Sequence, residues 1–291
     1  MIMKRSSIQI QTNQFKKASY PYSSITSPTP LPIQNSTVYF IIGHPDDEVM
    51  FFSPSLLEIS KPKNNNKVKL ICFSSGDSVD ESIGRIRSQE LFHSAKILGI
   101  SKEDVTVLDF KDGMNETWDS NDIKSALGDI IGLSHSGPVA LVTFDENGVS
   151  NHPNHISLYH GTLNFFRTYY KSKKQDISSV PGNSLASTNK LYVLKSLNFW
   201  EKYSFTFLTN LELFVDQLSK LIFSNLLVNV NISFFSQNLN PSIKFYSDLN
   251  MLSVSYAAMS YGHFSQMVWF RYGWLILSRY LTFNQLNEIL S

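Results

Sequence analysis

The chain has 291 residues, of which 42% are hydrophobic and 17% charged, and its formal net charge is +1 at pH 7. This length and apolar content suit one large or two small globular domains and exclude a chain that is disordered throughout. The near-neutral charge, without a block of lysine or arginine, argues against a protein that binds nucleic acid through bulk electrostatics.

The first segment, residues 1–36, is rich in Ser, Thr, Gln, Asn and Pro and has only isolated apolar side chains. Such a segment cannot bury enough apolar surface to fold. We therefore predict a disordered polar tail over 1–36 and a single domain over 37–291. The tail lacks the apolar core of a signal peptide, and we find no run of about 20 predominantly apolar residues that would span a bilayer.

After the tail, predicted strands and helices alternate along the chain. Four apolar runs predict strands, and a helical pattern follows each; the strands are at 38–42, 67–74, 104–110 and 138–144, and the helices at 53–58, 87–98, 122–133 and 156–170. The first strand has no polar alternation, which is typical of a strand covered on both faces. Repeated strand–helix units predict an α/β, Rossmann-like fold with a mainly parallel sheet and helices on both faces. The one cysteine, Cys72, lies in the second strand, so no disulfide forms within the chain and a reducing compartment fits.

The first predicted strand ends in one imidazole and three carboxylates, in the sequence Gly43-His44-Pro45-Asp46-Asp47-Glu48. In open α/β sheets the ligand crevice lies beyond the carboxyl ends of the strands. His plus Asp at this spacing suits a zinc-type cation and leaves one carboxylate free to handle protons. Taken alone, the cluster equally fits a turn with a helix-capping aspartate.

The fourth predicted strand ends in a second cluster, which runs from Asp145 to His155. His152 and His155 are three residues apart around Pro153, which can open a helix, so both side chains can face the same crevice. Because two strand ends each supply metal-binding groups, we favour a metal site at the carboxyl ends of the strands over a simple turn.

The two clusters resemble the motifs of the PIG-L/LmbE-like de-N-acetylases, which read AHPDDE and HPxH. Other segments are similar to the eukaryotic branch of that family, and the resemblance spans about residues 37–290; these segments are 87–91, 112–119, 143–150 and 258–280. The resemblance implies removal of the acetyl group from the glycolipid N-acetylglucosaminylphosphatidylinositol, a step in the synthesis of glycosylphosphatidylinositol anchors. It also implies a location at the cytosolic face of the endoplasmic reticulum membrane.

Position by position, the resemblance implies a role for each polar residue of the two motifs. His44, Asp47 and His155 would hold zinc or another divalent transition metal. Asp46 would be the general base that takes a proton from the attacking water. His152 would stabilise the oxyanion or help to protonate the leaving amine. Outside the motifs, Arg87 matches an arginine that contacts the substrate and Asp112 a carboxylate that binds sugar hydroxyls. Their structural alternatives are a solvated charge at a helix end and a turn former.

Three positions depart from the family pattern. Gly43 replaces the usual alanine, a small-for-small change that we expect to leave the geometry intact. Asn154 stands where bacterial relatives have a carboxylate, and this leaves the protonation state of His152 open. One extra residue precedes His263 in the carboxy-terminal segment, so a functional role for this histidine is also open.

Two aromatic-rich segments, 199–208 and 269–275, offer Trp and Tyr side chains that suit the headgroup depth of a membrane. We expect residues 269–277 to belong to the core instead, and leave 203–208 open. Animal and fungal relatives usually have an amino-terminal transmembrane helix, which residues 1–36 do not resemble, so we expect peripheral attachment to the membrane surface. We also predict a loop insertion at 171–189 and a half-buried strand at 226–234.

Two other functions stay open. A soluble LmbE-like enzyme that deacetylates a water-soluble N-acetylglucosamine conjugate would need no transmembrane helix, although the carboxy-terminal segment favours the glycolipid enzyme. A non-catalytic glycolipid-binding protein or complex subunit is disfavoured by Asp46, since a binding protein needs no free base beside the metal.

Overall fold

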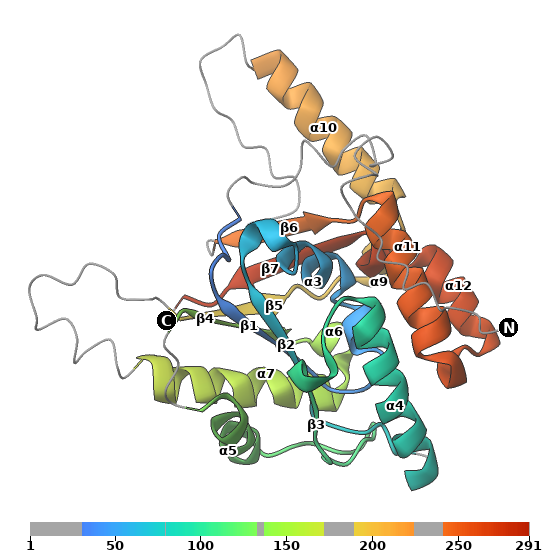
Figure 1. Ribbon diagram of the computed structural model, residues 1–291. Helices are drawn as coiled ribbons and strands as arrows, with labels where there is room; N and C mark the ends of the chain where they lie inside the picture. Colours follow the sequence, from blue (N-terminus) through green and yellow to red (C-terminus); the bar gives the residue numbers. More distant parts are fainter. Residues whose placement is uncertain (1–30, 79, 133–136, 172–188, 224–240, 291) are drawn as a thin grey trace, which may run out of the picture.

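The computed structural model describes residues 31–78, 80–132, 137–171, 189–223 and 241–290. Its centre is a seven-stranded sheet with the strand order β3-β2-β1-β4-β5-β7-β6 (Figure 1). The first five of these strands run parallel: β1 Thr37–Ile42, β2 Lys67–Cys72, β3 Val105–Val107, β4 Val139–Phe144 and β5 Lys190–Leu194. This confirms the predicted mainly parallel α/β sheet.

The order of the parallel strands reverses at β1, so that β2 and β3 extend to one side and β4 and β5 to the other. Because crossovers between parallel strands are right-handed, the connecting helices lie on opposite faces of the sheet on the two sides of β1. The longer helices are α3 Ser53–Ile59, α4 Glu81–Ile97, α5 Ser120–Ile131, α7 Pro153–Phe166, α10 Phe207–Phe223, α11 Leu249–Ala257 and α12 Trp269–Leu277. The short helical segments that matter below are α2 Asp47–Met50, α6 Gly148–Asn151, α9 Phe199–Lys202, η5 Ala258–Gly262, η6 Phe264–Gln266 and η7 Arg279–Leu281.

Two antiparallel strands, β6 Ser242–Tyr246 and β7 Phe283–Glu288, complete the sheet beside β5. Neither strand was predicted from the sequence. The strand predicted at 226–234 lies outside the described residues, as does most of the loop predicted at 171–189. In β7 the Asn284 side chain is buried and satisfied: its Oδ1 accepts from Ser55 N and Oγ at 3.1 and 2.9 Å, and its Nδ2 donates to Phe51 O at 2.8 Å. Because polar residues occupy buried positions in β7, apolar periodicity does not reveal the strand.

The boundary predicted for the tail is wrong by at least six residues. Leu31 and Ile33 are only 7% and 2% exposed and belong to the core, and Ser36 N donates to Asn66 Oδ1 at 3.1 Å. Two apolar side chains spaced by two residues are enough to attach 31–36 to the domain when a hydrogen-bonded backbone accompanies them. Residues 1–30 lie outside the described part of the chain.

The expectation that residues 269–277 belong to the core is also wrong for most of the segment. In α12 only Trp274 and Leu275 are buried, whereas Trp269 is 85% and Ile276 63% exposed. A nine-residue helix that packs one face on the protein leaves the other face outside, and here that outer face is apolar too. In the described residues, no helix combines the length and the apolar character needed to cross a bilayer.

Candidate metal and catalytic site

The turn between β1 and α2 presents the first cluster at the carboxyl edge of the sheet. The Asp47 carboxylate closes this turn, because its Oδ2 accepts from the backbone N–H groups of Gly43 and His44, both at 2.9 Å. Asp46 has a φ of 126°, a value that is costly for a residue other than glycine. Its N–H donates to Glu48 Oε2 at 3.1 Å, so the strained turn is held by the carboxylate two residues on.

The His155 side chain has one nitrogen that is satisfied and one that is not. Its Nδ1 lies 3.1 Å from Gly148 O, and since a carbonyl only accepts, Nδ1 carries the proton. Nε2 is then a bare lone pair, buried without a hydrogen-bond partner, and it lies 3.2 Å from Asp47 Oδ2. Two electron-rich atoms in buried contact call for a shared proton or a metal cation between them.

The His44 ring is oriented in the same manner. Its Nε2 lies 2.9 Å from Asp112 Oδ1 and 3.1 Å from Asn154 Oδ1, and both of these oxygens accept. The other nitrogen, Nδ1, is therefore free as a ligand, and it lies 3.7 Å from Asp47 Oδ2. A carboxylate or amide on the far nitrogen is the usual way in which a protein orients a metal-binding histidine.

His44, Asp47 and His155 thus form a buried group whose ligand atoms lie within 4.8 Å of one another. Nitrogen and oxygen donors in this number suit zinc or a similar transition metal with an open position. The ligand atoms of a second group, His44, Asp112 and His152, also lie within 4.8 Å of one another, but this group is less buried. It would need His44 Nε2, which the hydrogen bonds above already occupy, so the first group fits an ion better.

Electrostatics prepares the first group for a cation. Although burial opposes its charge, the imidazoles of His155 and His44 hold the pKa of Asp47 well below its ordinary value. Burial likewise disfavours a charged His44, but the hydrogen bond to Asp112 and the surrounding carboxylates outweigh it and raise the pKa of His44. Metal binding at His44 therefore competes with its protonation.

Asp46 is buried next to the metal-binding group and lies between two arginines. Arg271 Nη2 is 2.9 Å and Arg87 Nη2 3.8 Å from Asp46 Oδ2. Burial raises the pKa of Asp46, and the two guanidinium groups oppose this rise without cancelling it. A buried carboxyl with a raised pKa is suited to taking and returning a proton.

His152 caps α7, since its Nδ1 accepts from Asn154 N at 3.3 Å. The proton of the neutral ring is therefore on Nε2. Burial and the neighbouring His155 and His44 lower the pKa of His152 to about 4, so the ring is neutral at pH 7. The protonation state that the sequence left open is thereby assigned: Asn154 donates to Glu116 O and accepts from His44, and adds no charge beside His152.

Arg87 and Asp112 complete the cluster, so that all seven residues predicted for the site lie around one place. Arg87 donates to Gly76 O and Pro45 O at 2.9 and 3.1 Å, and its Nη1 is 3.7 Å from Asp112 Oδ2. Gly76 has a φ of +76°, and a Cβ there would come within 2.3 Å of the guanidinium. Only glycine leaves room for Arg87 over this turn.

Gly43 is not equivalent to alanine in this structure. A Cβ at position 43 would lie 2.9 Å from His155 Cδ2 and 3.3 Å from Asp47 Oδ2. The expectation that a small-for-small change leaves the geometry intact is therefore corrected: with alanine, His155 has to shift.

Three residues of the carboxy-terminal part contact the cluster; Arg271 and Gln266 were not predicted, and the role of His263 was left open. Besides Arg271, Gln266 Nε2 donates to Pro45 O at 3.1 Å. His263 Nε2 lies 2.6 Å from Glu48 Oε1, and both side chains are fully buried. The extra residue before His263 is taken up by the π-helical turn η5, which holds one residue more than an α-helical turn. For Arg271 a signal existed, because it is the only charge in the apolar run 269–277 and a charge there needs a partner.

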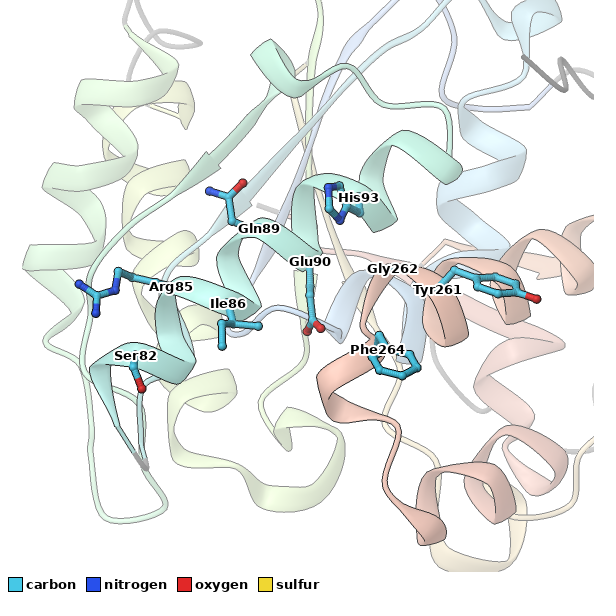
Figure 2. A pocket seen from close by; sticks show the side chains of 9 residues that line it. All are labelled: Ser82, Arg85, Ile86, Gln89, Glu90, His93, Tyr261, Gly262 and Phe264. Carbon is cyan, nitrogen blue, oxygen red and sulfur yellow. The ribbon is translucent and has the colours of Figure 1, made fainter. Parts of the chain in front are cut away.

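An open groove of about 500 Å³ lies between α4 and the segment η5–η6 (Figure 2). Figure 2 shows Ile86 and Glu90 on the α4 side and Tyr261 and Phe264 on the other. The Glu90 carboxylate accepts from Ser265 N and Oγ at 2.6 and 2.7 Å. None of the seven predicted site residues lines this groove, so it is distinct from the cluster.

Comparison with known proteins identifies the family. Residues 39–166 match the PIG-L family, described as GlcNAc-PI de-N-acetylase. The chain is 32% identical to the N-acetylglucosaminyl-phosphatidylinositol de-N-acetylase of Arthroderma benhamiae over 303 aligned residues, covering 88% of each protein. The chain belongs to the PIG-L family. The enzyme of the same name from Saccharomyces cerevisiae is 34% identical, over 86% of this chain and 80% of its own.

Solved structures agree on the fold of this PIG-L family member. A deacetylase triple mutant from the teicoplanin biosynthetic pathway superimposes with a TM-score of 0.52, covering 88% of this chain and 99% of its own. The two sequences are only 13% identical, so this likeness concerns the fold alone.

Proposed function

We propose that the protein hydrolyses the acetamide of N-acetylglucosaminylphosphatidylinositol to acetate and glucosaminylphosphatidylinositol, as an enzyme of anchor biosynthesis. Membership of the PIG-L family and the name shared by its relatives support this substrate. The observation that carries the chemistry is the buried Asp46, which stands beside a His44–Asp47–His155 group suited to a metal.

Each residue of the cluster has a task in this proposal. His44, Asp47 and His155 would hold zinc or another divalent transition metal, which would supply Lewis acidity and make a water more acidic. Asp46 takes a proton from the attacking water, whose oxygen bonds to the acetamide carbon. His152 donates from Nε2–H to the oxyanion that forms. Asp46 then returns the proton to the sugar nitrogen as the C–N bond breaks, and acetate and the free amine leave.

Arg87 and Asp112 serve the sugar and the geometry around it. Arg87 is fixed by two backbone carbonyls and is 15% exposed, so it keeps donors for a hydroxyl or carbonyl of the substrate. Asp112 orients His44 through Oδ1 and accepts sugar hydroxyls through its other oxygen.

The proposal includes peripheral attachment to the cytosolic face of the endoplasmic reticulum membrane. The relatives are named for a substrate with a phosphatidylinositol part, and acyl chains confine such a molecule to a bilayer. The enzyme therefore has to act at a membrane surface.

The test is acetate release by the purified protein from N-acetylglucosaminylphosphatidylinositol and from a water-soluble N-acetylglucosaminylinositol analogue, each with and without a chelator. We expect chelator-sensitive turnover of the glycolipid, restored by added zinc. A clear preference for the soluble analogue would favour a soluble LmbE-like deacetylase. Absence of turnover of either compound with zinc present would overturn the catalytic proposal and favour a glycolipid-binding protein.

A further inference from the structure

In the described part of the chain, the helices α9 and α12 expose several large apolar side chains. We call the exposed side chains of α9 and α12 the aromatic face: Phe199, Trp200, Trp269, Phe270, Tyr272 and Ile276. Trp200 and Trp269 are 81% and 85% exposed. A single exposed apolar residue is ordinary on a protein surface, whereas several on one nine-residue helix, as on α12, are typical of an interaction site.

Helix α12 has two faces with different partners. At about 100° per residue, Arg271, Trp274 and Leu275 fall on one side and Trp269, Tyr272 and Ile276 on the other. Trp274 and Leu275 are buried and Arg271 binds Asp46 at 2.9 Å. The inner side of α12 thus reaches the catalytic carboxylate, while its outer side carries no acidic residue and is more than half exposed at each of the three positions.

Helix α10 repeats this arrangement. Its exposed apolar residues form a stripe within about 60° of the helix circumference: Phe207, Leu211, Phe214 and Leu218. Opposite this stripe, the first turns of α10 are anchored, since Glu212 Oε2 lies 2.9 Å and Thr209 Oγ1 3.2 Å from the buried guanidinium of Arg279. The stripe therefore faces away from the protein, because the anchoring residues hold the other side of α10 inward.

The two helices are joined at their ends. Phe205 N, just before α10, donates to Leu277 O, the last residue of α12, at 3.0 Å. Arg279, which anchors α10, follows α12 by two residues. In Figure 1 α9, α11 and α12 lie on the same side of the molecule, away from the label of β4. The aromatic face thus belongs to the part of the chain whose Arg271 contacts Asp46.

We propose that the aromatic face docks on a lipid bilayer, with the α10 stripe as a second contact, and that α12 holds the site at the bilayer surface. Trp and Tyr mixed with aliphatic side chains are typical of surfaces that sit at headgroup depth. A substrate whose sugar reacts at Asp46 and whose acyl chains stay in the bilayer requires lipid within reach of Arg271, the residue that joins Asp46 to this helix. The choice of lipid as the occupant rests on the proposed function.

The experiment combines flotation of the full chain with vesicles of phosphatidylcholine and phosphatidylinositol and two activity measurements. The double variant Trp269→Ser/Ile276→Ser removes two exposed anchors and leaves Arg271 in place. Leu290→Ser, at a 57% exposed residue beyond β7, is the matched control. Deacetylation is measured on glycolipid in vesicles and on the water-soluble analogue.

We expect the double variant to lose about tenfold or more in the vesicle-bound fraction and in kcat/KM on vesicles, since each anchor contributes to partitioning. Its rate on the soluble analogue should stay within about twofold of the wild type, which also reports correct folding. Leu290→Ser should behave as the wild type throughout. Flotation of the double variant at the wild-type level would overturn the docking proposal. Flotation needs no turnover, so it tests docking independently of activity. Absence of turnover of both substrates would overturn the proposed function and leave the flotation result unaffected.

Discussion

The two parts of the chain contribute to the site in different ways. Residues 37–166 supply all seven of the predicted side chains, mainly from turns at the carboxyl ends of β1 and β4. Residues 241–290 supply side chains that contact those turns from outside: Arg271 on Asp46, Gln266 on Pro45 and His263 on Glu48. The reacting groups come from short local motifs and are supported locally by Glu48 and Arg87, whereas Arg271 and Gln266, which also hold this turn, come from more than 200 residues away.

The strained turn at Asp46 depends on residues outside its own motif. Asp46 has a positive φ and a buried carboxylate, both of which cost free energy. Glu48, Arg271 and Gln266 all bind the backbone or side chain of this turn, and they offset that cost. The motif alone therefore does not hold its own geometry, and substitutions in the two parts should have different signatures.

The largest loss, of both bound metal and activity, is expected from His155→Ala in the amino-terminal part. Loss of one of three ligands leaves His44 and Asp47 without a complete site, so bound metal falls below about one tenth of the wild type and acetate release becomes undetectable. Metal content by mass spectrometry and turnover on the same sample check this. His160→Ala, at an exposed histidine on the same helix, is the control. Full metal content in His155→Ala would rule out this residue as a ligand.

A loss of stability is expected from His263→Leu, which removes the contact of the carboxy-terminal part with Glu48. The Glu48 carboxylate is left buried without its charge partner, which costs about 3–5 kcal/mol in the free energy of unfolding. Urea denaturation measures this, with His93→Leu at an exposed position as the control. A loss below about 1 kcal/mol would show that the pair contributes little beyond ordinary surface contacts.

The same pair predicts a pH dependence with a definite sign. Although burial opposes it, the Glu48 charge raises the pKa of His263 above its ordinary value of 6.5. The unfolded chain then releases this proton at lower pH than the folded one. The stabilisation is full below pH 6.5 and is lost as the pH rises through the folded-state pKa. The stability difference between the wild type and His263→Leu should shrink over that range.

A smaller loss of activity, about tenfold at pH 7, is expected from Arg271→Gln. This substitution removes the positive charge where the two parts meet and keeps a polar side chain there. Arg271 lowers the pKa of Asp46 against the effect of burial, so its removal leaves more of the base protonated. The acid limb of the pH–rate profile should move up by about one unit, and activity should recover at higher pH. Arg271→Lys keeps the charge and should keep the limb. An equal loss at every pH would mean that Arg271 acts other than on Asp46.

The sequence was sufficient for the parallel sheet and for the five motif residues of the cluster, whereas Arg87 and Asp112 came only from the family resemblance. Val38–Ile42 is apolar throughout and Val139–Phe144 apolar except for Thr143, so their strands and the polar residues that follow them were recognisable from local pattern. His152 and His155 share a helix start, and Pro153 marks it. Each of these inferences depends on neighbours within a few residues, and this is the range over which periodicity and capping act.

The remaining features depend on contacts between distant segments. The tautomers of His44 and His155 are fixed by Asp112 and by Gly148 O, and no spacing in the sequence indicates those hydrogen bonds. Asn284 is buried only because Ser55 and Phe51 satisfy its amide. The exposed side of α12 has the composition of a core helix, so composition predicted burial where the structure has an outer surface.

The most direct test of the central claim, that Asp46 acts as the base beside the metal-binding group, is turnover by Asp46→Asn measured together with its metal content. The amide keeps the size of the side chain and can still pair with Arg271, but it cannot take a proton. We predict a loss of about 10²–10⁴-fold in kcat on the glycolipid with metal content unchanged. Retention of activity within about tenfold would contradict the role of Asp46 as base, and parallel loss of metal would make it a ligand instead.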